Sequence, residues 1–596
     1  MKRWFKYARP YLSYFILGPV CMIIEVLGEM IMPKMLSIII DYGTGQAAAE
    51  TAPDWVKKLY DITGSSSPFI VAISVGMVLT AIIMMVGGVG GAYFGAKASV
   101  NFAADLRSDI YRKVQQFSFA NIDRFSTASL VTRLTNDVTQ IQNFINMLLR
   151  MCLRAPGMFI GGTIMAIVVS PSLSVTLGVA MPLIILTIAF FIKSALPRFT
   201  KQQEKIDALN KRVQENVTNV RVVKSFVREE YEKKAFAFAN SDLRKTAFSA
   251  MKMIILIFPA MSFFMNATTL SVLWLGGRMV AVGDMTTGSL TAFITYIFQI
   301  LMSLIGLTMI FMGFSRALAS SKRIAEVLDE KIDVSDSGLS DEDEQRRITE
   351  GEIEFKNISF RYYKNSADKV LDNINLKILP GQTVGIIGST GSGKSTLVSL
   401  IARLYDPDEG EVLVDGENVK NYTLKNLRDG IGFVLQKNEL FSGTISDNLI
   451  WGDENADVSE IKQMAAYAQA DSFISSFTDG YDTVLDAGGT NVSGGQKQRI
   501  CIARALIKKP KILVLDDSTS AVDTATEEKI RQAFASELKE STKIIIAQRI
   551  SSVKDCDLIV VLDDGKITGT GTHNELMGSN TEYTEIYYSQ NEKEAG

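Results

Sequence analysis

Six apolar stretches lie in the first 314 residues of this 596-residue chain, and each is near the length of about 20 residues that a helix needs to cross a bilayer. Backbone polar groups must be paired inside lipid, so such stretches are predicted to be membrane helices. Ser170-Pro171-Ser172 breaks the chain between the third and fourth stretches, which predicts a tight hairpin. The stretches cover residues 11–32, 69–94, 153–169, 173–192, 253–275 and 290–314.

The basic residues indicate which ends of these spans face the cytosol. Arginine and lysine are frequent before the first span and in the long connections 107–133 and 193–252. By the positive-inside rule these parts are cytoplasmic, and the connection 41–68 faces outward. We therefore expect a multi-pass protein of the cell's cytoplasmic (inner) membrane, in contact with the lipid bilayer, with everything after the sixth span in the cytoplasm.

Two cytoplasmic connections are too long to be simple turns, and both have a helical composition. The membrane helices are therefore expected to continue beyond the bilayer. Residues 116–125 and 214–226 lie midway along the two connections. We interpret them as short coupling helices that contact a soluble domain, the alternative being ordinary solvated helix.

An acidic stretch divides the chain into a membrane part and a soluble part. Residues 329–350 include Asp341-Glu342-Asp343-Glu344, a charge run typical of a solvated linker. From Gly351 onward, short β runs alternate with helical segments, which predicts an α/β domain with a largely parallel sheet. The expected organisation is a helical membrane domain over 1–328, the linker, and an α/β P-loop domain over 351–596.

A glycine-rich phosphate-binding motif follows the apolar run that ends at Ile387. Glycines let backbone N–H groups wrap phosphates at a helix N-terminus, while Lys394 reaches the β and γ oxygens and Ser395 reaches Mg²⁺. Three further signals follow in order: Gln436, the Ser493-Gly494-Gly495-Gln496 segment, and Asp516 at the end of an apolar run. The motif itself consists of Gly388, Ser389, Thr390, Gly391, Ser392, Gly393, Lys394, Ser395 and Thr396.

With these motifs, the chain resembles a half-transporter of the ABC exporter family over nearly its whole length. The resemblance implies ATP and Mg²⁺ as ligands, with Tyr362 of the Phe360-Arg361-Tyr362 segment stacked on adenine. It also implies that Ser395, Gln436 and Asp516 hold the metal, and that Ser493 to Gln496 form a signature contacting the γ-phosphate bound by a second subunit. Asp523 ends the D-loop Ser520-Ala521-Val522-Asp523.

Two positions depart from the family's pattern. Asp517 stands where a glutamate usually polarises the attacking water, and Gln548 stands where a histidine usually contacts the γ-phosphate. Aspartate is one methylene shorter, and glutamine can neither titrate nor carry charge. The only histidine, His573, comes too late in the chain to replace it.

These departures resemble the degenerate half of bacterial heterodimeric multidrug exporters. The resemblance implies a partner half-transporter with Glu and His at the matching positions, and a signature in this chain that serves the partner's site. Catalytic candidates are therefore Asp517, Gln548 and Gln436 in the chain's own weak site, with Ser493, Gly494, Gly495 and Gln496 acting on the other.

Polar residues within the spans are candidates for substrate contact. Glu25 and Glu29 are four residues apart and lie on one helix face, where ionisable groups are costly in lipid and indicate a cavity or a partner. They form a cation-attracting wall of a substrate pathway, an acidic rim of the outward vestibule, or a helix-packing hydrogen bond. Asn266 and Gln299 are further candidates.

The leading hypothesis is ATP-driven export of small hydrophobic or cationic compounds by a heterodimer. One alternative is a homodimeric lipid or peptide exporter with Asp517 as a weak base. Another is a non-pumping subunit, such as an ATP-gated channel or a regulator. A net charge of −3 and the lack of a basic aromatic patch give no sign of a nucleic-acid partner.

Overall fold

The computed structural model describes residues 2–44, 53–336, 338–363, 368–517 and 522–594. The chain forms two compact units. The first comprises Met1–Arg112 and Leu130–Leu328, and the second comprises Lys113–Ser129 and Asp329–Gly596. The short segment 113–129 therefore packs with the soluble unit, although its neighbours in sequence belong to the membrane helices.

The first unit is helical, and six of its helical segments are long and apolar enough to cross a membrane, which confirms the six predicted spans. One break falls at Ser170, as predicted. The helices are α1 (Lys2–Ala8), α2 (Leu12–Ile38), α3 (Asp54–Thr63), α4 (Ser66–Gln115), α6 (Thr127–Thr132), α7 (Val138–Met151), α8 (Arg154–Val169), α9 (Pro171–Thr218), α10 (Val220–Ser225), α11 (Glu229–Val282) and α12 (Thr287–Asp329), with 3-10 or π turns at Arg9–Tyr11, Ile39–Gly43 and Arg133–Asp137.

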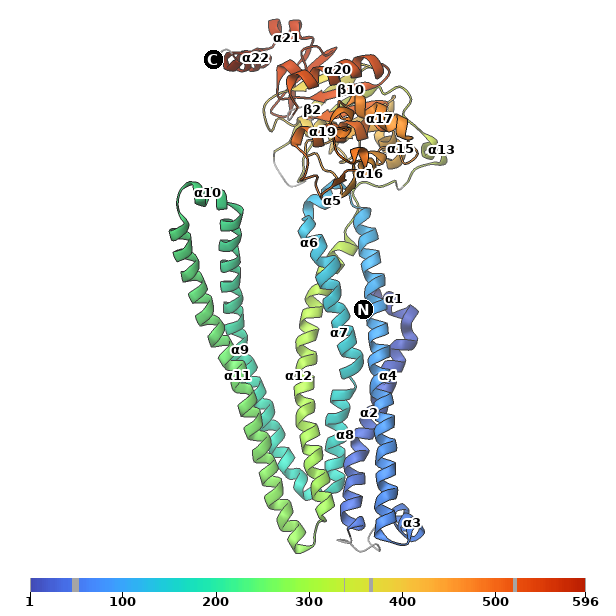
Figure 1. Cartoon of the computed structure of the whole chain (residues 1–596), viewed down its shortest axis with the longest axis vertical. Coiled ribbons are helices and arrows are strands. Elements are labelled where there is room, and N and C mark those ends of the chain that lie inside the picture. Colours follow the sequence, from blue (N-terminus) through green and yellow to red (C-terminus); the bar gives the residue numbers. More distant parts are fainter. Residues whose placement is uncertain (1, 45–52, 337, 364–367, 518–521, 595–596) are drawn as a thin grey trace. The chain divides into compact units, whose positions relative to one another are not determined.

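Local chemistry sets these helix boundaries and contacts. Ser170 caps α9 by accepting a hydrogen bond from the Leu173 N–H at 3.3 Å, and Pro171 occupies the first turn, where its missing N–H costs nothing. Glycines bring α4 close to α2, since a Cβ on Gly87 would lie 2.9 Å from the Cys21 carbonyl oxygen. Helices α9 and α11 form a long hairpin whose tip is α10 (Figure 1).

The second unit is the α/β domain. Its main sheet has the order β12-β11-β3-β10-β9-β6, and every pairing except β12 with β11 is parallel. This confirms the predicted largely parallel sheet. The strands are β1 (Ile353–Phe360), β2 (Leu371–Ile378), β3 (Thr383–Ile387), β4 (Glu409–Val414), β5 (Glu417–Asn418), β6 (Ile431–Val434), β7 (Gly443–Thr444), β8 (Val484–Leu485), β9 (Ile512–Asp516), β10 (Thr542–Ile546), β11 (Leu558–Asp563) and β12 (Lys566–Gly571).

A second sheet, of order β2-β1-β4-β5, is antiparallel, and β7 pairs with β8. Helices surround these sheets. They are α5 (Phe119–Arg124), α13 (Asp341–Gln345), α14 (Lys394–Ile401), α15 (Leu424–Asp429), α16 (Ile445–Ile450), α17 (Val458–Tyr467), α18 (Asp471–Ile474), α19 (Gly494–Ile507), α20 (Thr524–Glu537), α21 (His573–Ser579) and α22 (Thr581–Glu594), with short 3-10 turns at Val419–Asn421, Gly480–Asp482 and Ile550–Ser552.

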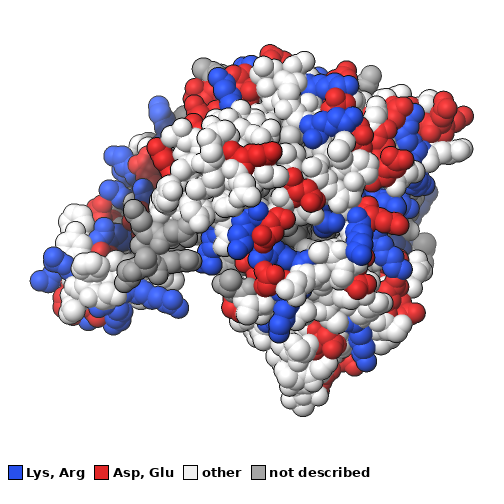
Figure 2. Space-filling model, turned by 90° about the horizontal axis from the view of Figure 1, so that it is seen from above, with Lys and Arg blue, Asp and Glu red and all other residues white. Residues whose placement is uncertain are grey.

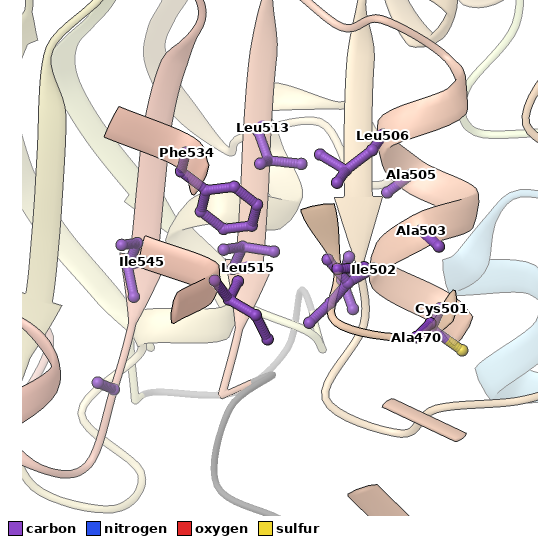
Figure 3. Packing of buried hydrophobic residues seen from close by; sticks show 14 of the residues in the cluster. Ala470, Cys501, Ile502, Ala503, Ala505, Leu506, Leu513, Leu515, Phe534 and Ile545 are labelled. Atoms are coloured by element: carbon purple, nitrogen blue, oxygen red, sulfur yellow. The ribbon is translucent and has the colours of Figure 1, made fainter. Parts of the chain in front are cut away.

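The core of the second unit anchors helix α19 to strand β9. Ile502 and Leu506 of α19 belong to the same buried cluster as Leu513 and Leu515 of β9, and Phe534 of α20 packs beside them (Figure 3). Each such side chain contributes about 1.5–3 kcal/mol when fully buried. The helix that begins at the signature is thus held on the strand that ends at Asp516.

Short helices form in both segments predicted to couple the domains. Helix α5 begins at Ser118, whose hydroxyl accepts from the Asn121 N–H in a reciprocal capping box. Helix α10 forms the tip of the α9–α11 hairpin.

Acidic and basic side chains are intermixed on the molecular surface seen in Figure 2, so that surface carries no extended electric field of one sign.

Candidate functional site

The phosphate-binding loop connects β3 to α14, and its backbone requires glycine. Gly391 and Gly393 have φ values of +88° and +98°, a region that side chains disfavour. A Cβ on Gly388 would lie 1.9 Å from the Leu562 carbonyl oxygen. Ser389, Thr390 and Ser392 lie within the loop, and Thr396 lies in the first turn of α14. The loop and helix N-terminus together present N–H donors for an anion.

Lys394, Ser395 and Asp516 supply the charged and hydroxyl groups of this site. Lys394 Nζ donates to the carbonyl oxygens of Gly388 at 2.9 Å and Ser389 at 2.7 Å. Ser395 Oγ donates to Asp516 Oδ1 at 2.9 Å, at the buried end of β9. A hydroxyl and a carboxylate side by side are the oxygen ligands that Mg²⁺ prefers beside a nucleotide, so the residues present fit the ion.

Burial shifts the pKa values of these groups in opposite directions. It lowers the pKa of Lys394, against the attraction of Asp517 and Asp516. It raises the pKa of Asp516, against the hydrogen bond from Ser395. The charged form of each side chain is therefore less favourable here than in water. A bound phosphate would favour the charged form of Lys394, and a bound cation would favour the ionised form of Asp516.

The two unusual residues are in contact with each other. Gln548 follows β10, and its Nε2 donates to Asp517 Oδ2 at 2.8 Å. Gln436, which follows β6, also hydrogen-bonds to Asp517. Burial raises the pKa of Asp517, and the hydrogen bonds from Gln548 and Gln436 act against that rise. Two amides thus hold the carboxylate at the position where the family usually has its base.

Tyr362 is the expected adenine platform. The residue is 45% exposed and its hydroxyl lies 2.9 Å from Thr396 Oγ1, so it stands beside the phosphate loop and is partly open to solvent. Its ring also makes an edge-on contact with Tyr405, with centroids 5.3 Å apart.

The signature residues lie apart from the phosphate loop in the hydrogen-bond network of the described residues. Ser493 caps α19 through a box with Gln496, with 2.9 Å from Ser493 N to Gln496 Oε1. Ser493 and Gly494 are exposed, and Gly494 and Gly495 are the first two residues of the helix. Asp523 similarly caps α20, whereas Ser520 and Ala521 lie outside the described residues. The signature is a helix N-terminus open to a ligand held elsewhere.

In the membrane helices, the structure brings three of the four substrate candidates together. Arg154 at the start of α8 bridges Glu25 Oε1 at 3.2 Å and Glu29 Oε1 at 2.6 Å. Gln299 of α12 donates to the Glu29 carbonyl oxygen at 3.1 Å. Asn266 instead donates to Ser262, one turn back in its own helix.

Sequence reasoning missed two residues of these sites. Arg154 carried a signal, because it was a charge at the very start of a predicted span. Tyr405 carried none, since it lies between α14 and β4 in a loop without a recognised motif.

Known proteins resemble this chain over its whole length. Residues 15–304 match the ABC transporter transmembrane region, and residues 371–520 match the ABC transporter family. The uncharacterized ABC transporter ATP-binding protein YfiB of Bacillus subtilis is 36% identical over 591 residues, covering 99% of this chain and 98% of that protein. The uncharacterized ABC transporter ATP-binding protein Rv1273c of Mycobacterium tuberculosis is 36% identical over 592 residues, with 98% and 97% covered.

A solved structure shares the fold. The structure of a bacterial Atm1-family ABC exporter with ATP bound matches with a TM-score of 0.72 at 24% identity. The match covers 96% of this chain and 98% of that one.

Proposed function

The chain belongs to the ABC transporter family, and on that premise we propose that it is the degenerate half of a heterodimeric exporter. Its own site binds ATP with Mg²⁺ and hydrolyses it poorly, and its signature completes the catalytic site of a partner half-transporter. The partner carries Glu and His where this chain has Asp517 and Gln548. The cytoplasmic membrane is the proposed location, with the nucleotide-binding unit in the cytoplasm.

The hydrogen bond between Gln548 and Asp517 carries this proposal. A general base must reach its water, and a displacement of about 1 Å costs about a hundredfold in rate. Asp517 is one methylene shorter than glutamate, and its Oδ2 already accepts from Gln548. With Gln436 also bonded to Asp517, the carboxylate is held away from a role as base.

Binding does not depend on that carboxylate. The loop glycines, Lys394 and the Ser395–Asp516 pair retain every feature that phosphate and metal binding needs. When Mg²⁺ is bound, it offsets phosphate charge. The chain's residues then hold the nucleotide by loop N–H groups, the Lys394 ammonium and the Tyr362 ring.

The intact signature supports the proposal that this chain completes the catalytic site of its partner. Ser493 and the N–H groups of Gly494 and Gly495 form an exposed helix N-terminus, which favours an anion. Donors aimed at developing charge lower a barrier by several kcal/mol when they act in a competent site. We therefore place the turnover of the pair in the partner's site.

The group of Glu25, Glu29 and Arg154 supports a cationic or amphipathic substrate. One guanidinium pairs with two carboxylates, so this group of three side chains carries one excess negative charge when both carboxylates are ionised. Glu25 Oε2, Glu29 Oε2 and Gln299 Oε1 are buried and accept no hydrogen bond from the described residues. Uncompensated charge of this kind is costly in a membrane protein and marks a substrate or ion pathway.

Purification tests the pairing. The chain, tagged and extracted from its native membrane in mild detergent, is expected to bring down a second half-transporter in equal amount, with Glu and His at the matching positions. The mixed pair should hydrolyse ATP, and the lone chain should not. Robust hydrolysis by the lone chain that Asp517→Asn abolishes would show a homodimer with Asp517 as its base.

A further inference from the structure

Tyr405 connects the expected adenine platform to helix α5. Its hydroxyl donates to Asp123 Oδ2 of α5 at 2.7 Å. Its ring meets Phe119 of α5 edge-on, with centroids 6.0 Å apart, and meets Tyr362 edge-on at 5.3 Å and 87°. All of these residues belong to the second unit, so the contacts lie within one compact body.

The loop that carries Tyr405 is also tied to the segment that carries Tyr362. The Arg361 N–H donates to Asp408 Oδ2 at 2.8 Å, and the Arg361 guanidinium lies 3.7 Å from the same carboxylate. A shift of Tyr362 is therefore transmitted to this loop through the backbone as well as through the rings.

Helix α5 also contacts the segment that follows α12, so it is anchored at two points and we expect it to move as a rigid unit. Arg124 pairs with Glu330 at 2.8 Å, and Asn121 Nδ2 donates to the Lys331 carbonyl oxygen at 2.9 Å. Its capping box at Ser118 closes the first turn. Tyr405 adds a third contact, between this anchored helix and the segment that carries Tyr362.

The hydroxyl of Tyr405 stays a hydrogen-bond donor at physiological pH. Burial and the adjacent Asp123 both raise its pKa above the ordinary value for tyrosine. The bond to Asp123 is therefore charge-assisted and directional, with a neutral phenol as donor. Edge-on aromatic pairs likewise depend on the angle between the rings.

We infer that Tyr405 is a positioning residue that couples base stacking on Tyr362 to the position and order of α5. A base stacked on the exposed part of Tyr362 fixes that ring, the perpendicular contact fixes Tyr405, and the hydroxyl fixes Asp123. Helix α5 then reports the presence of the base. The inference rests on the proposed function only in that Tyr362 stacks on adenine.

Amide hydrogen exchange of the full chain in lipid nanodiscs tests this coupling. MgATP is expected to slow exchange in the peptide covering residues 113–129, and magnesium tripolyphosphate, which lacks a base, is not. Tyr405→Phe keeps the rings and removes the donor. It should leave the dissociation constant for MgATP within about twofold and abolish most of the ATP-dependent protection of α5.

Asp123→Ala removes the acceptor and should give the same result from the other side of the bond. Tyr422→Phe is the matched control: Tyr422 donates to the Val414 carbonyl oxygen at 3.0 Å, is fully buried, and makes no hydrogen bond to α5 among the described residues. It should retain the protection. Full protection in Tyr405→Phe, or equal protection by tripolyphosphate, overturns the inference.

A separate variant distinguishes failure of the coupling from failure of the proposed adenine contact. Tyr362→Ala should weaken MgATP binding and leave tripolyphosphate binding unchanged. If Tyr362→Ala binds MgATP as tightly as the native chain, the adenine platform is wrong and the coupling fails with it. If Tyr362→Ala weakens binding and Tyr405→Phe still shows protection, only the coupling is wrong.

Discussion

Gln548 Nε2 lies 2.8 Å from Asp517 Oδ2, so the two residues that depart from the family's pattern engage each other directly. Asp517 has a φ of +47°, an unusual value for a residue with a side chain, and its N–H donates to the Ile546 carbonyl oxygen at 3.0 Å. Its carboxylate position is therefore fixed by the backbone and by Gln548 together. Restoring one residue alone leaves the other in the way.

The contact predicts strong coupling between Asp517→Glu and Gln548→His. We expect each single variant of the lone chain to hydrolyse ATP near background and the double variant to exceed both by at least about tenfold, because base reach and the γ-phosphate contact return together. Single-turnover hydrolysis of labelled ATP measures this. Lys394→Ala in the double background is the control and should remove the gain. Additive single effects would contradict the coupling.

The signature predicts a second asymmetry, in the mixed pair. If the signature acts in the partner's site and Asp517 only in its own, as proposed, Ser493→Arg should abolish most turnover and Asp517→Ala should cost little. Ser493→Asp separates chemistry from folding, because aspartate keeps the cap of α19 but repels phosphate. It should also be inactive while assembling normally on size exclusion. Asp517→Ala as damaging as Ser493→Arg would make this chain's own site catalytic.

Nucleotide retention depends on Lys394. Its ammonium lies among the loop carbonyls of Gly388 and Ser389, where phosphate oxygens give it stronger acceptors. Lys394→Ala should lose trapped ATP from this chain and leave part of the turnover of the pair. Photolabelling with an ATP analogue, read separately on each subunit, measures both. Lys377→Ala, which removes only a surface pair with Glu352, is the control. Equal collapse of turnover with either subunit's lysine would show that the sites are interdependent.

As the pH is lowered, metal binding should weaken at a higher pH than it would with an ordinary aspartate as ligand. Burial raises the pKa of Asp516, so protons compete with Mg²⁺ for this carboxylate at a higher pH than usual. As pH falls from neutral toward the ordinary carboxyl range, the Mg²⁺-dependent part of ATP binding should decline, and Asp516→Asn should remove that dependence. Titration of a fluorescent ATP analogue with and without Mg²⁺ measures it. A constant Mg²⁺ effect down to the ordinary aspartate pKa would contradict this.

Local signals explain which features could be predicted from the sequence. The membrane spans depend on composition over about 20 residues, and the phosphate loop depends on glycines at fixed spacing. Both can therefore be recognised from the sequence alone. The grouping of α5 with the second unit depends on contacts between residues far apart in the sequence. The hydrogen bond between Tyr405 and Asp123, for example, joins residues 282 positions apart. Only folding brings such residues together.

The charge group in the membrane helices shows the same limit. The spacing of Glu25 and Glu29 predicts one shared helix face, and the structure shows that both meet Arg154. Asn266 has the same sequence signal as Gln299, yet it bonds within its own helix. A polar residue in a predicted span therefore indicates that it needs a hydrogen-bond partner. Only the fold shows whether that partner lies in the same helix or in a site shared by several helices.

That group predicts selective loss of cation transport. Glu25→Gln or Glu29→Gln removes the excess negative charge, and each should lower transport of a lipophilic monocation such as tetraphenylphosphonium several-fold, roughly 1 kcal/mol, while a neutral compound of similar size is moved as before. Gly88→Ala tests the same site without changing charge, since its Cβ would lie 3.2 Å from Glu25 Oε2. It should displace that oxygen and lower cation transport too.

Two controls of matched chemistry accompany these variants in inside-out vesicles of the mixed pair. Asn266→Ala removes a polar group that bonds only to Ser262 among the described residues, and Gly178→Ala adds a methyl group where nothing lies within 4 Å. Both should transport the cation normally. Because Arg154 loses only one of two partners in each single glutamate variant, the helices should stay assembled, whereas replacing both would leave it unpaired. Equal loss of cation and neutral transport in Glu25→Gln and Glu29→Gln would mean that the group packs the helices and contacts no substrate.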